Sequence, residues 1–413
     1  MPWRCAYVHA SATSSHVRDL SHYAGQRLGH YVCVPASSAS DRGLLLFLPG
    51  TAPSMYKLIA QTAADAGYHT ISLSWVNHPS AECVVHGCKN PHIVHDEALI
   101  NCTRQVALMR FFGASTSTPS NCVGYTLDPP NAVHDRAVAL LRHLAKNASS
   151  LLGSDHWQRY LDCSGTKLQW TEVSVGGHSR ARCAHSDSQC PPPNLSRTRP
   201  LSVCARLSRA GGSYYPVLLS KRIAFRRALL FGGPGQLVVG ECRSEAPMRA
   251  YNDCYPPFGF GVGRWVLEQS KVPVHRWFGL MAAYRGDACS IARPAWAALG
   301  LRGAATVDSA TARLPSREMA AALGGAHQIF DRGVCVSSNS PHMCLVADAS
   351  TPLDRSGRPL LAQLWNFMLT SEDEPSATAL ETEAGVNCTM VVPNLRRMHA
   401  PALRTRSSVS GNS

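Results

Sequence analysis

"GLLLFLPGTAPSMYKLIAQTAADAGYHTISLSWVN", residues 43–77, has the pattern of a strand, a helix and a second strand. Residues 44–48 form a continuous apolar run of strand length, and residues 55–66 carry apolar side chains at helical spacing. A second run of strand length follows at residues 70–75. Strands that are apolar on both faces are typical of a parallel sheet covered by helices. This unit therefore predicts an α/β fold with a mostly parallel central sheet and helices on both faces.

Similar patterns extend this fold along the chain. Apolar residues three and four apart predict an amphipathic helix over residues 132–146, and "PLLAQLWNFMLT" predicts a closing helix at residues 359–370. The β-branched residues of "WTEVSVGG" indicate a further strand. Two more apolar strands are predicted within residues 226–236 and 276–288, the first ending in glycines and the second in an aspartate.

The composition fits one folded domain. The chain has 413 residues, of which 45% are hydrophobic, so it can bury a large core and is not a fully disordered protein. We assign residues 31–370 to a single α/β domain and residues 1–30 to an N-terminal extension. Residues 371–413 are rich in serine, threonine, proline and charge with little periodicity, which predicts a disordered tail.

The charge and the hydropathy exclude two classes of partner. The formal net charge is +13, but the basic residues are scattered rather than gathered into a run with interleaved aromatic residues. A nucleic-acid groove would need such a run, so we expect a solvated basic surface and no nucleic acid. Nothing in the sequence approaches the roughly 20 continuous apolar residues of a membrane span, so no transmembrane segment is expected.

The cysteines and the glycosylation acceptors point to an oxidising compartment. The chain has sixteen cysteines and Asn-x-Ser/Thr acceptor sequences at Asn101, Asn147 and Asn387. Its first residues nevertheless lack the apolar centre of a secretory signal. Two explanations stay open: a signal lies upstream of the first residue, or the cysteines are buried thiols and the acceptor sequences arise by chance.

A cluster of histidines and cysteines, "HPSAECVVHGCKNPHIVH" at residues 78–95, raises the question of a zinc site. Its spacings fit none of the closed structural zinc patterns, and it offers no pair of ligands on a helix. We expect a surface loop or a Cys83–Cys88 link there, and no metal or organic cofactor in the protein.

The clearest chemical motif follows the strand in "WTEVSVGG". Gly177-His178-Ser179-Arg180-Ala181 matches the Gly-x-Ser-x-Gly nucleophile elbow, with alanine in place of the last glycine. The elbow holds its serine in a strained turn at a strand end, so the residues two before and two after must be small. The pentapeptide alone is a weak signal, and a glycine-rich turn without catalytic function is the alternative.

An acid and a histidine follow this serine in the order of an α/β-hydrolase triad, Ser179, Asp287, His342. In this scheme His342 removes the serine proton, Asp287 holds the imidazole in the required tautomer, and Ser179 attacks a carbonyl carbon. We prefer His342 over His327 because it lies in a predicted loop after the last strand, where a base can reach the carboxyl edge of the sheet. Asp253 is the alternative acid.

The oxyanion that forms in such a reaction needs two preorganised donors. We expect them to be the backbone N–H groups of Arg180, which follows the nucleophile, and of Thr51 in the Pro-Gly-Thr turn after the first strand.

These segments together resemble a known family. "LLLFLPGTAPSMYKLIAQTAADAGYHTISLSW", "WTEVSVGGHSR", "RRALLFGGPG", "RWFGLMAAYRGDA" and "PHMCLVAD" are similar to a poorly characterised group of α/β-hydrolase-fold proteins of bacteria and microbial eukaryotes. Members have an L-P-G-T turn, a G-H-S-Q-G-type elbow and a strand ending in G-P. The resemblance covers residues 31–370, implies a serine-hydrolase fold with Ser179, Asp287 and His342 as the triad, and supplies no substrate. Arg180 replaces the usual glutamine.

A second departure from the family follows the elbow. There the family enters a helix directly, whereas this chain has "ARCAHSDSQCPPPNLSRTRPLSVCARLSR" at residues 181–209. Its three consecutive prolines cannot occupy a helix interior. Ser179-Arg180-Ala181 recurs as Ser208-Arg209-Ala210, and deletion of residues 181–209 restores an elbow followed by small residues and a helix. Our hypothesis is that these residues come from a translated intron or a gene-model error; a genuine surface loop is the alternative.

The sequence thus predicts a serine-dependent hydrolase that acts on a small-molecule carboxylic ester, or less readily on an amide or thioester. The alternative from another class is a catalytically inactive α/β-hydrolase-fold binding protein. The insertion and Ala181 favour the inactive protein, and the acid and the histidine at the expected places favour the enzyme.

Overall fold

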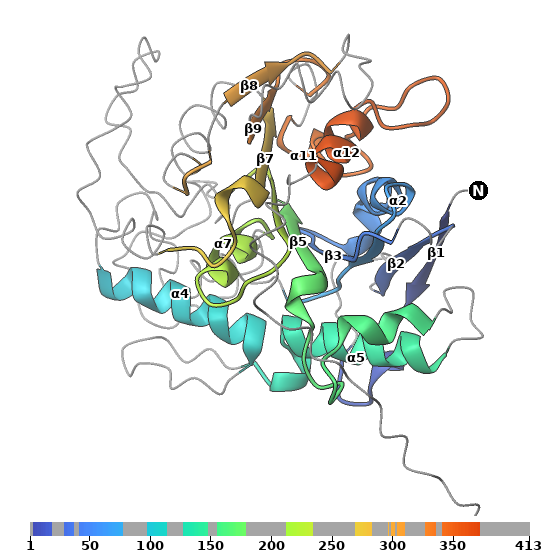
Figure 1. Ribbon diagram of the computed structural model, residues 1–413, viewed down its shortest axis with the longest axis vertical. Helices are drawn as coiled ribbons and strands as arrows, with labels where there is room; N and C mark the ends of the chain where they lie inside the picture. The colour runs from blue at the N-terminus through green and yellow to red at the C-terminus, as the bar shows by residue number, and fades with distance from the viewer. Residues whose placement is uncertain are drawn as a thin grey trace, which may run out of the picture. The chain divides into compact units, whose positions relative to one another are not determined.

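One mixed β-sheet forms the centre of the protein (Figure 1). The computed structural model describes residues 3–18, 29–36, 41–76, 97–113, 127–147, 155–178, 212–233, 269–282, 296, 299–301, 304–309, 327–335 and 341–371. Within them, nine strands follow the order β1-β2-β4-β3-β5-β6-β7-β9-β8. The strands from β4 to β8 in this order are parallel, whereas β2 is antiparallel to β4 and β1 is antiparallel to β2.

The strands and helices alternate along much of the chain. The strands are β1 (Trp3–Val8), β2 (His30–Pro35), β3 (Leu44–Leu48), β4 (His69–Ser72), β5 (Val173–His178), β6 (Arg227–Phe231), β7 (Trp277–Ala282), β8 (Ala304–Val307) and β9 (Gln328–Asp331). The α-helices are α1 (Ala10–Thr13), α2 (Lys57–Asp65), α4 (Glu97–Phe112), α5 (Val133–Lys146), α7 (Tyr214–Ser220), α11 (Pro341–Cys344) and α12 (Ala362–Thr370).

The predicted α/β class with a mostly parallel sheet is confirmed. The continuous apolar run at residues 44–48 is β3, and every one of its side chains is buried. The predicted helices at residues 132–146 and 359–370 are α5 and α12. The antiparallel edge was not predicted: Trp3–Val8, inside the segment that we expected to be an extension, is strand β1 and pairs with β2.

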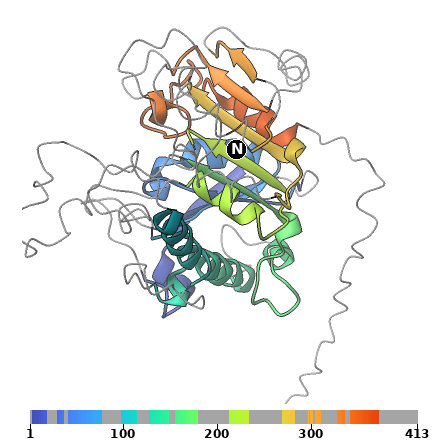
Figure 2. The same cartoon turned by 90° about the vertical axis from the view of Figure 1, so that its left-hand side faces the viewer.

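The helices lie in two layers because the chain reverses its direction across the sheet. From β3 it passes through α2 to β4 on one side, and it then returns over β3 to β5 on the other. Right-handed crossovers in opposite directions place their helices on opposite faces. Accordingly α2 packs against α12, while α4 contacts both α5 and α7 (Figure 1); Figure 2 shows α4 and α5 together beside the strands.

This reversal creates a switch point between β3 and β5. The first α-helices that the structure describes after these two neighbouring strands, α2 and α7, lie on opposite faces of the sheet. In open α/β sheets, ligands bind in the crevice outside the carboxyl ends at such a point. The topology therefore makes this edge of β3 and β5 the first place to look for a functional site.

A buried polar cluster occupies the opposite, amino edge. His69, the first residue of β4, is 2% exposed, and its Nδ1 lies 2.8 Å from the Tyr160 hydroxyl. Asp41 lies beside both, 3.8 Å from His69 Nδ1, and forms an ion pair with Arg159. Burial lowers the pKa of His69 to about 4, although the Asp41 carboxylate acts in the opposite direction.

Among the residues that the structure describes, none of the helices has the length and apolar character needed to cross a membrane.

The lowered pKa of His69 predicts a stability loss in mild acid. Below its ordinary pKa of 6.5 the unfolded chain takes up a proton at this imidazole, whereas the folded chain resists until about pH 4. The stabilisation is thus complete above pH 6.5 and is lost as the pH falls toward 4, by about 3 kcal/mol at most.

We expect His69→Gln to flatten the pH dependence of the free energy of unfolding in this interval, measured by urea denaturation. We expect some pH dependence to remain in His69→Gln, because burial also lowers the pKa of His178. His275→Gln, at an exposed position, is the matched control. Equal slopes for His69→Gln and the parent protein would contradict this explanation.

Candidate active site

Strand register brings three chain segments together at the carboxyl edge of the sheet. Leu48, the last residue of β3, pairs with Gly177 of β5, and His178 at the end of β5 pairs with Phe231 of β6. The ends of β3, β5 and β6 therefore lie side by side. The residues that follow them in the sequence are Pro49, Ser179 and Gly232.

The structure describes two of the predicted site residues, Thr51 and His342. Ser179, Arg180 and Asp287 lie outside the described residues, as do Asp253, the cluster at residues 78–95, the insertion at residues 181–209 and the predicted tail. Ser179 is the next residue in the sequence after His178, the last residue of β5, whose position the structure describes.

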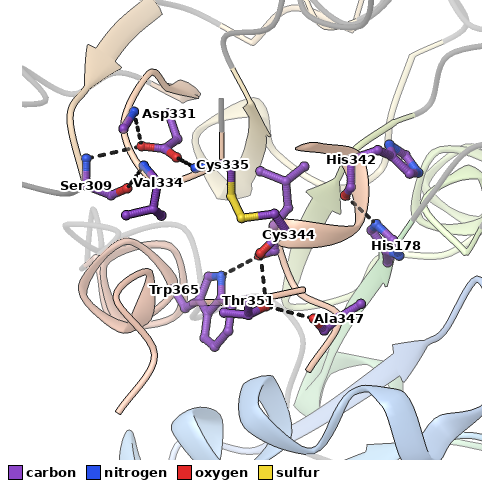
Figure 3. Close-up of a disulfide and its surroundings, with 12 residues drawn as sticks. His178, Ser309, Asp331, Val334, Cys335, His342, Cys344, Ala347, Thr351 and Trp365 are labelled. Carbon is purple, nitrogen blue, oxygen red and sulfur yellow. Dashed lines mark hydrogen bonds between the residues drawn. A yellow bond between two sulfur atoms is a disulfide. The ribbon is translucent and has the colours of Figure 1, made fainter. Parts of the chain in front are cut away.

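His178 is the central side chain of this edge, and the sequence analysis did not select it. It is 0% exposed. Its Nε2 lies 3.1 Å from the backbone oxygen of His342, and its Nδ1 lies 2.9 Å from the hydroxyl of Tyr56. Figure 3 shows the His178 ring directed toward the backbone of His342.

These contacts fix the tautomer of His178. A carbonyl oxygen only accepts, so Nε2 carries the hydrogen and donates it to His342. Burial, and then the neighbouring His342, hold the pKa of His178 well below its usual value, so the imidazole stays neutral and its Nδ1 accepts from the Tyr56 hydroxyl. The Tyr56 oxygen in turn accepts from the Thr51 hydroxyl at 3.1 Å.

The His178 imidazole thus joins three parts of the site. Through Tyr56 it reaches the turn after β3, and through the His342 carbonyl it reaches α11. The turn is held at a second point, because Trp75 Nε1 donates to the Pro49 oxygen at 3.1 Å.

The imidazole of His342 packs over the ends of β5 and β6. Its ring centroid lies 4.8 Å from that of His178. On the other side it meets Gly232, where a Cβ would come within 2.8 Å of His342 Cε1 and 2.9 Å of Nδ1. Gly232 also has a φ of +65°. Two properties of glycine, the missing side chain and the left-handed backbone, therefore make room for this imidazole.

The structure corrects one detail of the sequence analysis and separates the two candidate bases. His342 lies in the one-turn helix α11 rather than in a loop. His327 precedes β9, and its Nδ1 donates to the oxygen of Trp277, the first residue of β7, at 2.7 Å. In parallel strands this is the amino edge, so His327 lies at the end of the sheet opposite His178.

Gly177, two residues before the predicted nucleophile, lets the chain at Gly212 approach the end of β5 closely. A Cβ at Gly177 would lie 2.1 Å from the oxygen of Gly212, and one at Gly212 would lie 1.7 Å from the oxygen of Leu48. Gly212 also donates its N–H to the His178 oxygen at 2.8 Å. The chain thus returns to the end of β5 just before α7 begins at Tyr214.

Comparisons with protein families, with curated proteins and with solved structures find no match to this chain. Within the described ranges, no group of three or more histidine, cysteine, aspartate or glutamate side chains could hold a metal ion.

Gly232→Ala should displace His342, and Gly357→Ala is its matched control. Both glycines have positive φ, +65° and +80°, so alanine should destabilise the fold by about 1–2 kcal/mol at either position. Only at Gly232 does the new Cβ meet a side chain, since a Cβ at Gly357 has nothing within 4 Å.

We expect similar losses of stability in urea denaturation for the two variants. Long-range 1H–15N spectra of the imidazoles should show His178 as the Nε2–H tautomer in the parent protein, and shifted signals of His342 and His178 in Gly232→Ala alone. Unchanged histidine signals in Gly232→Ala would refute the packing described for His342.

Proposed function

We propose that the chain is a serine hydrolase of the α/β-hydrolase fold that cleaves a carboxylic ester. The described sheet supports this proposal: the strand order reverses so that β3 and β5 are parallel neighbours, and β5 ends at His178, the residue directly before Ser179 in the sequence. A nucleophile elbow requires this strand-to-helix setting. A pentapeptide that matched the motif by chance would not be expected at such a strand end, so this setting supports its assignment as a nucleophile elbow.

One observation carries the proposal. The His342 imidazole lies against His178, the residue directly before Ser179, although the two histidines are 164 positions apart in the chain. A general base must lie close to the hydroxyl nucleophile that it activates, and His342 lies next to the strand end that directly precedes Ser179 in the sequence. His342 is half-buried, so part of this residue is in contact with solvent.

In the proposed reaction, Ser179 attacks the ester carbonyl while His342 takes the hydroxyl proton. The proton then passes from His342 to the leaving alcohol, and an acyl-serine remains. Water attacks this acyl group with His342 again as the base, releasing the acid and restoring Ser179. Asp287 is the proposed partner of His342; it follows β7, the strand next to β6.

The proposed oxyanion donors are the backbone N–H groups of Thr51 and Arg180. Thr51 belongs to the turn that follows β3, and β3 is the neighbour of β5. Its hydroxyl is bonded to Tyr56, and Trp75 holds the same turn at Pro49. Donors that are fixed before the reaction stabilise developing charge without reorganisation, which is the main advantage of an oxyanion hole.

The contact between His178 and Gly212 bears on the insertion. Because these residues are hydrogen-bonded, the described parts of the chain on either side of residues 181–209 already lie in contact. Ser179, Arg180, Ala210 and Gly211 would then connect them, which is the length of a tight turn, and α7 would follow as the elbow helix. We propose that this shortened chain is the active form.

The second candidate is a catalytically inactive binding protein with the same fold. The observation that favours it is the break in the chain path between the elbow and its helix: α7 begins at Tyr214, so the chain does not pass from Ser179 directly into this helix. The amino end of that helix helps to stabilise an oxyanion next to the serine.

Fluorophosphonate labelling tests the function. We expect the purified chain without residues 181–209 to form an adduct at Ser179, and the chain as written to react at least about 100-fold more slowly, because a misplaced donor or nucleophile costs that much. Peptide mass spectrometry locates the adduct. It also separates Ser179 from Ser208, which begins the second Ser-Arg-Ala repeat.

Ser179→Ala in the shortened chain is the control and should not react. If neither form reacts, although circular dichroism shows both to be folded, the hydrolase proposal fails and the binding protein takes its place. In the reactive form, p-nitrophenyl esters and the matching anilides then show whether esters are preferred to amides.

A further inference from the structure

A disulfide closes the segment that carries His342. Cys335 and Cys344 are bonded and lie 9 positions apart, and both side chains are buried (Figure 3). Cys344 is the last residue of α11, two positions after His342. The bond therefore joins the chain before α11 to the end of the helix that presents the imidazole.

The first cysteine is fixed to the sheet. Cys335 donates its backbone N–H to Oδ2 of Asp331 at 3.1 Å, and Asp331 is the last residue of β9. The other oxygen of this buried carboxylate accepts the N–H groups of Ser309 and Gly333, at 3.1 and 3.0 Å. Cys335 is thus held by a rigid group at the carboxyl edge, the edge at which the candidate site lies.

The helix that carries His342 needs such support. It has four residues, and a single turn gains too few hydrogen bonds to persist alone in water. Several further contacts of this segment lie at or after Cys344: Thr351 Oγ1 donates to the Cys344 oxygen at 2.9 Å, and Trp365 Nε1 donates to the Leu345 oxygen at 3.0 Å. The disulfide anchors α11 to the β9 side of the site.

We propose that the Cys335–Cys344 disulfide is a redox-cleavable tether that positions His342 over the end of β5, so that hydrolase activity requires the oxidised protein. The inference rests on the proposed function, because it assigns His342 its role there. The two cysteines are positioning residues: they act on the reaction through His342.

The redox step needs a dithiol reductant. One of its thiolates attacks a protein sulfur to form a mixed disulfide, and its second thiol then closes the reductant's own disulfide. The protein gains two electrons and two protons and ends with two thiols. Because Cys335 and Cys344 are both buried, this exchange requires local opening of the segment.

The chain offers a matched control in its second described disulfide. Cys5 and Cys33 join β1 to β2 at the far edge of the sheet and are 28 positions apart. By the chain-entropy argument, loss of the bond that closes the longer loop should destabilise the fold at least as much. If activity fell only because the fold became less stable, the variant without the Cys5–Cys33 bond would therefore lose at least as much activity.

The test compares Cys335→Ala/Cys344→Ala with Cys5→Ala/Cys33→Ala, both in the form of the chain that reacts with a fluorophosphonate. Under conditions where both are fully folded, we expect the labelling rate to fall by about 10- to 100-fold in the first and less than about twofold in the second. With an ester substrate the loss should appear in kcat rather than in KM.

Amide hydrogen exchange gives a readout that does not depend on catalysis. Peptides that cover Met343–Ala347 should exchange faster in Cys335→Ala/Cys344→Ala and unchanged in the control. If neither parent form labels, the proposed function fails while the exchange data still test the tether. Unchanged exchange there, or equal activity losses in the two double variants, overturns the tether.

Reduction of the unmutated protein supplies a second measurement in case the variant does not fold. Dithiothreitol should lower the labelling rate once alkylation shows Cys335 and Cys344 to be free thiols, and oxidised glutathione should restore it. Full activity with both thiols free would overturn the proposal.

Discussion

The candidate site depends on one buried, neutral imidazole. His178 donates to the backbone of His342 and accepts from Tyr56, so it ties the end of β5 to α11 and to the turn after β3. A buried polar group that loses such partners carries the full cost of desolvation, which favours one arrangement of these segments over looser ones. His178 also directly precedes Ser179 in the sequence, so the proposed nucleophile and the proposed base are both linked to this residue.

The topology decides which segments this anchor can join. Reversal of the strand order after β4 makes β3 and β5 neighbours, so that the end of β3, which leads into the Pro-Gly-Thr turn, lies beside the end of β5 at His178. Two further features position the segment that carries His342. Gly232 leaves room for the imidazole ring, and the Cys335–Cys344 disulfide links α11 to the chain that follows β9. Asp348, which follows α11 in the chain, links this segment to α2, because its carboxylate accepts the first backbone N–H groups of that helix.

The sequence predicts those parts of the fold that depend on residues close together in the chain. β3 and α5 follow from their apolar patterns, and the glycine at 177 follows from the close approach that an elbow requires. The edge strand β1 and the role of His178 could not be found in this way. Pairing with β2 makes Trp3–Val8 a strand, and the elbow pattern leaves the residue before the serine unspecified. Contacts such as that between His178 and His342 join residues 164 positions apart, which no local periodicity can indicate.

The central claim is that Ser179 and His342 act together at the end of β5. The most direct measurement is a crystal structure of the chain without residues 181–209 after reaction with a phosphonate. We expect a phosphonylated Ser179 with an imidazole nitrogen of His342 within hydrogen-bond reach of its Oγ, about 3 Å. We also expect His178 still to donate to the His342 carbonyl. An adduct on another side chain, or His342 turned away from Ser179, would contradict the proposed roles of these two residues.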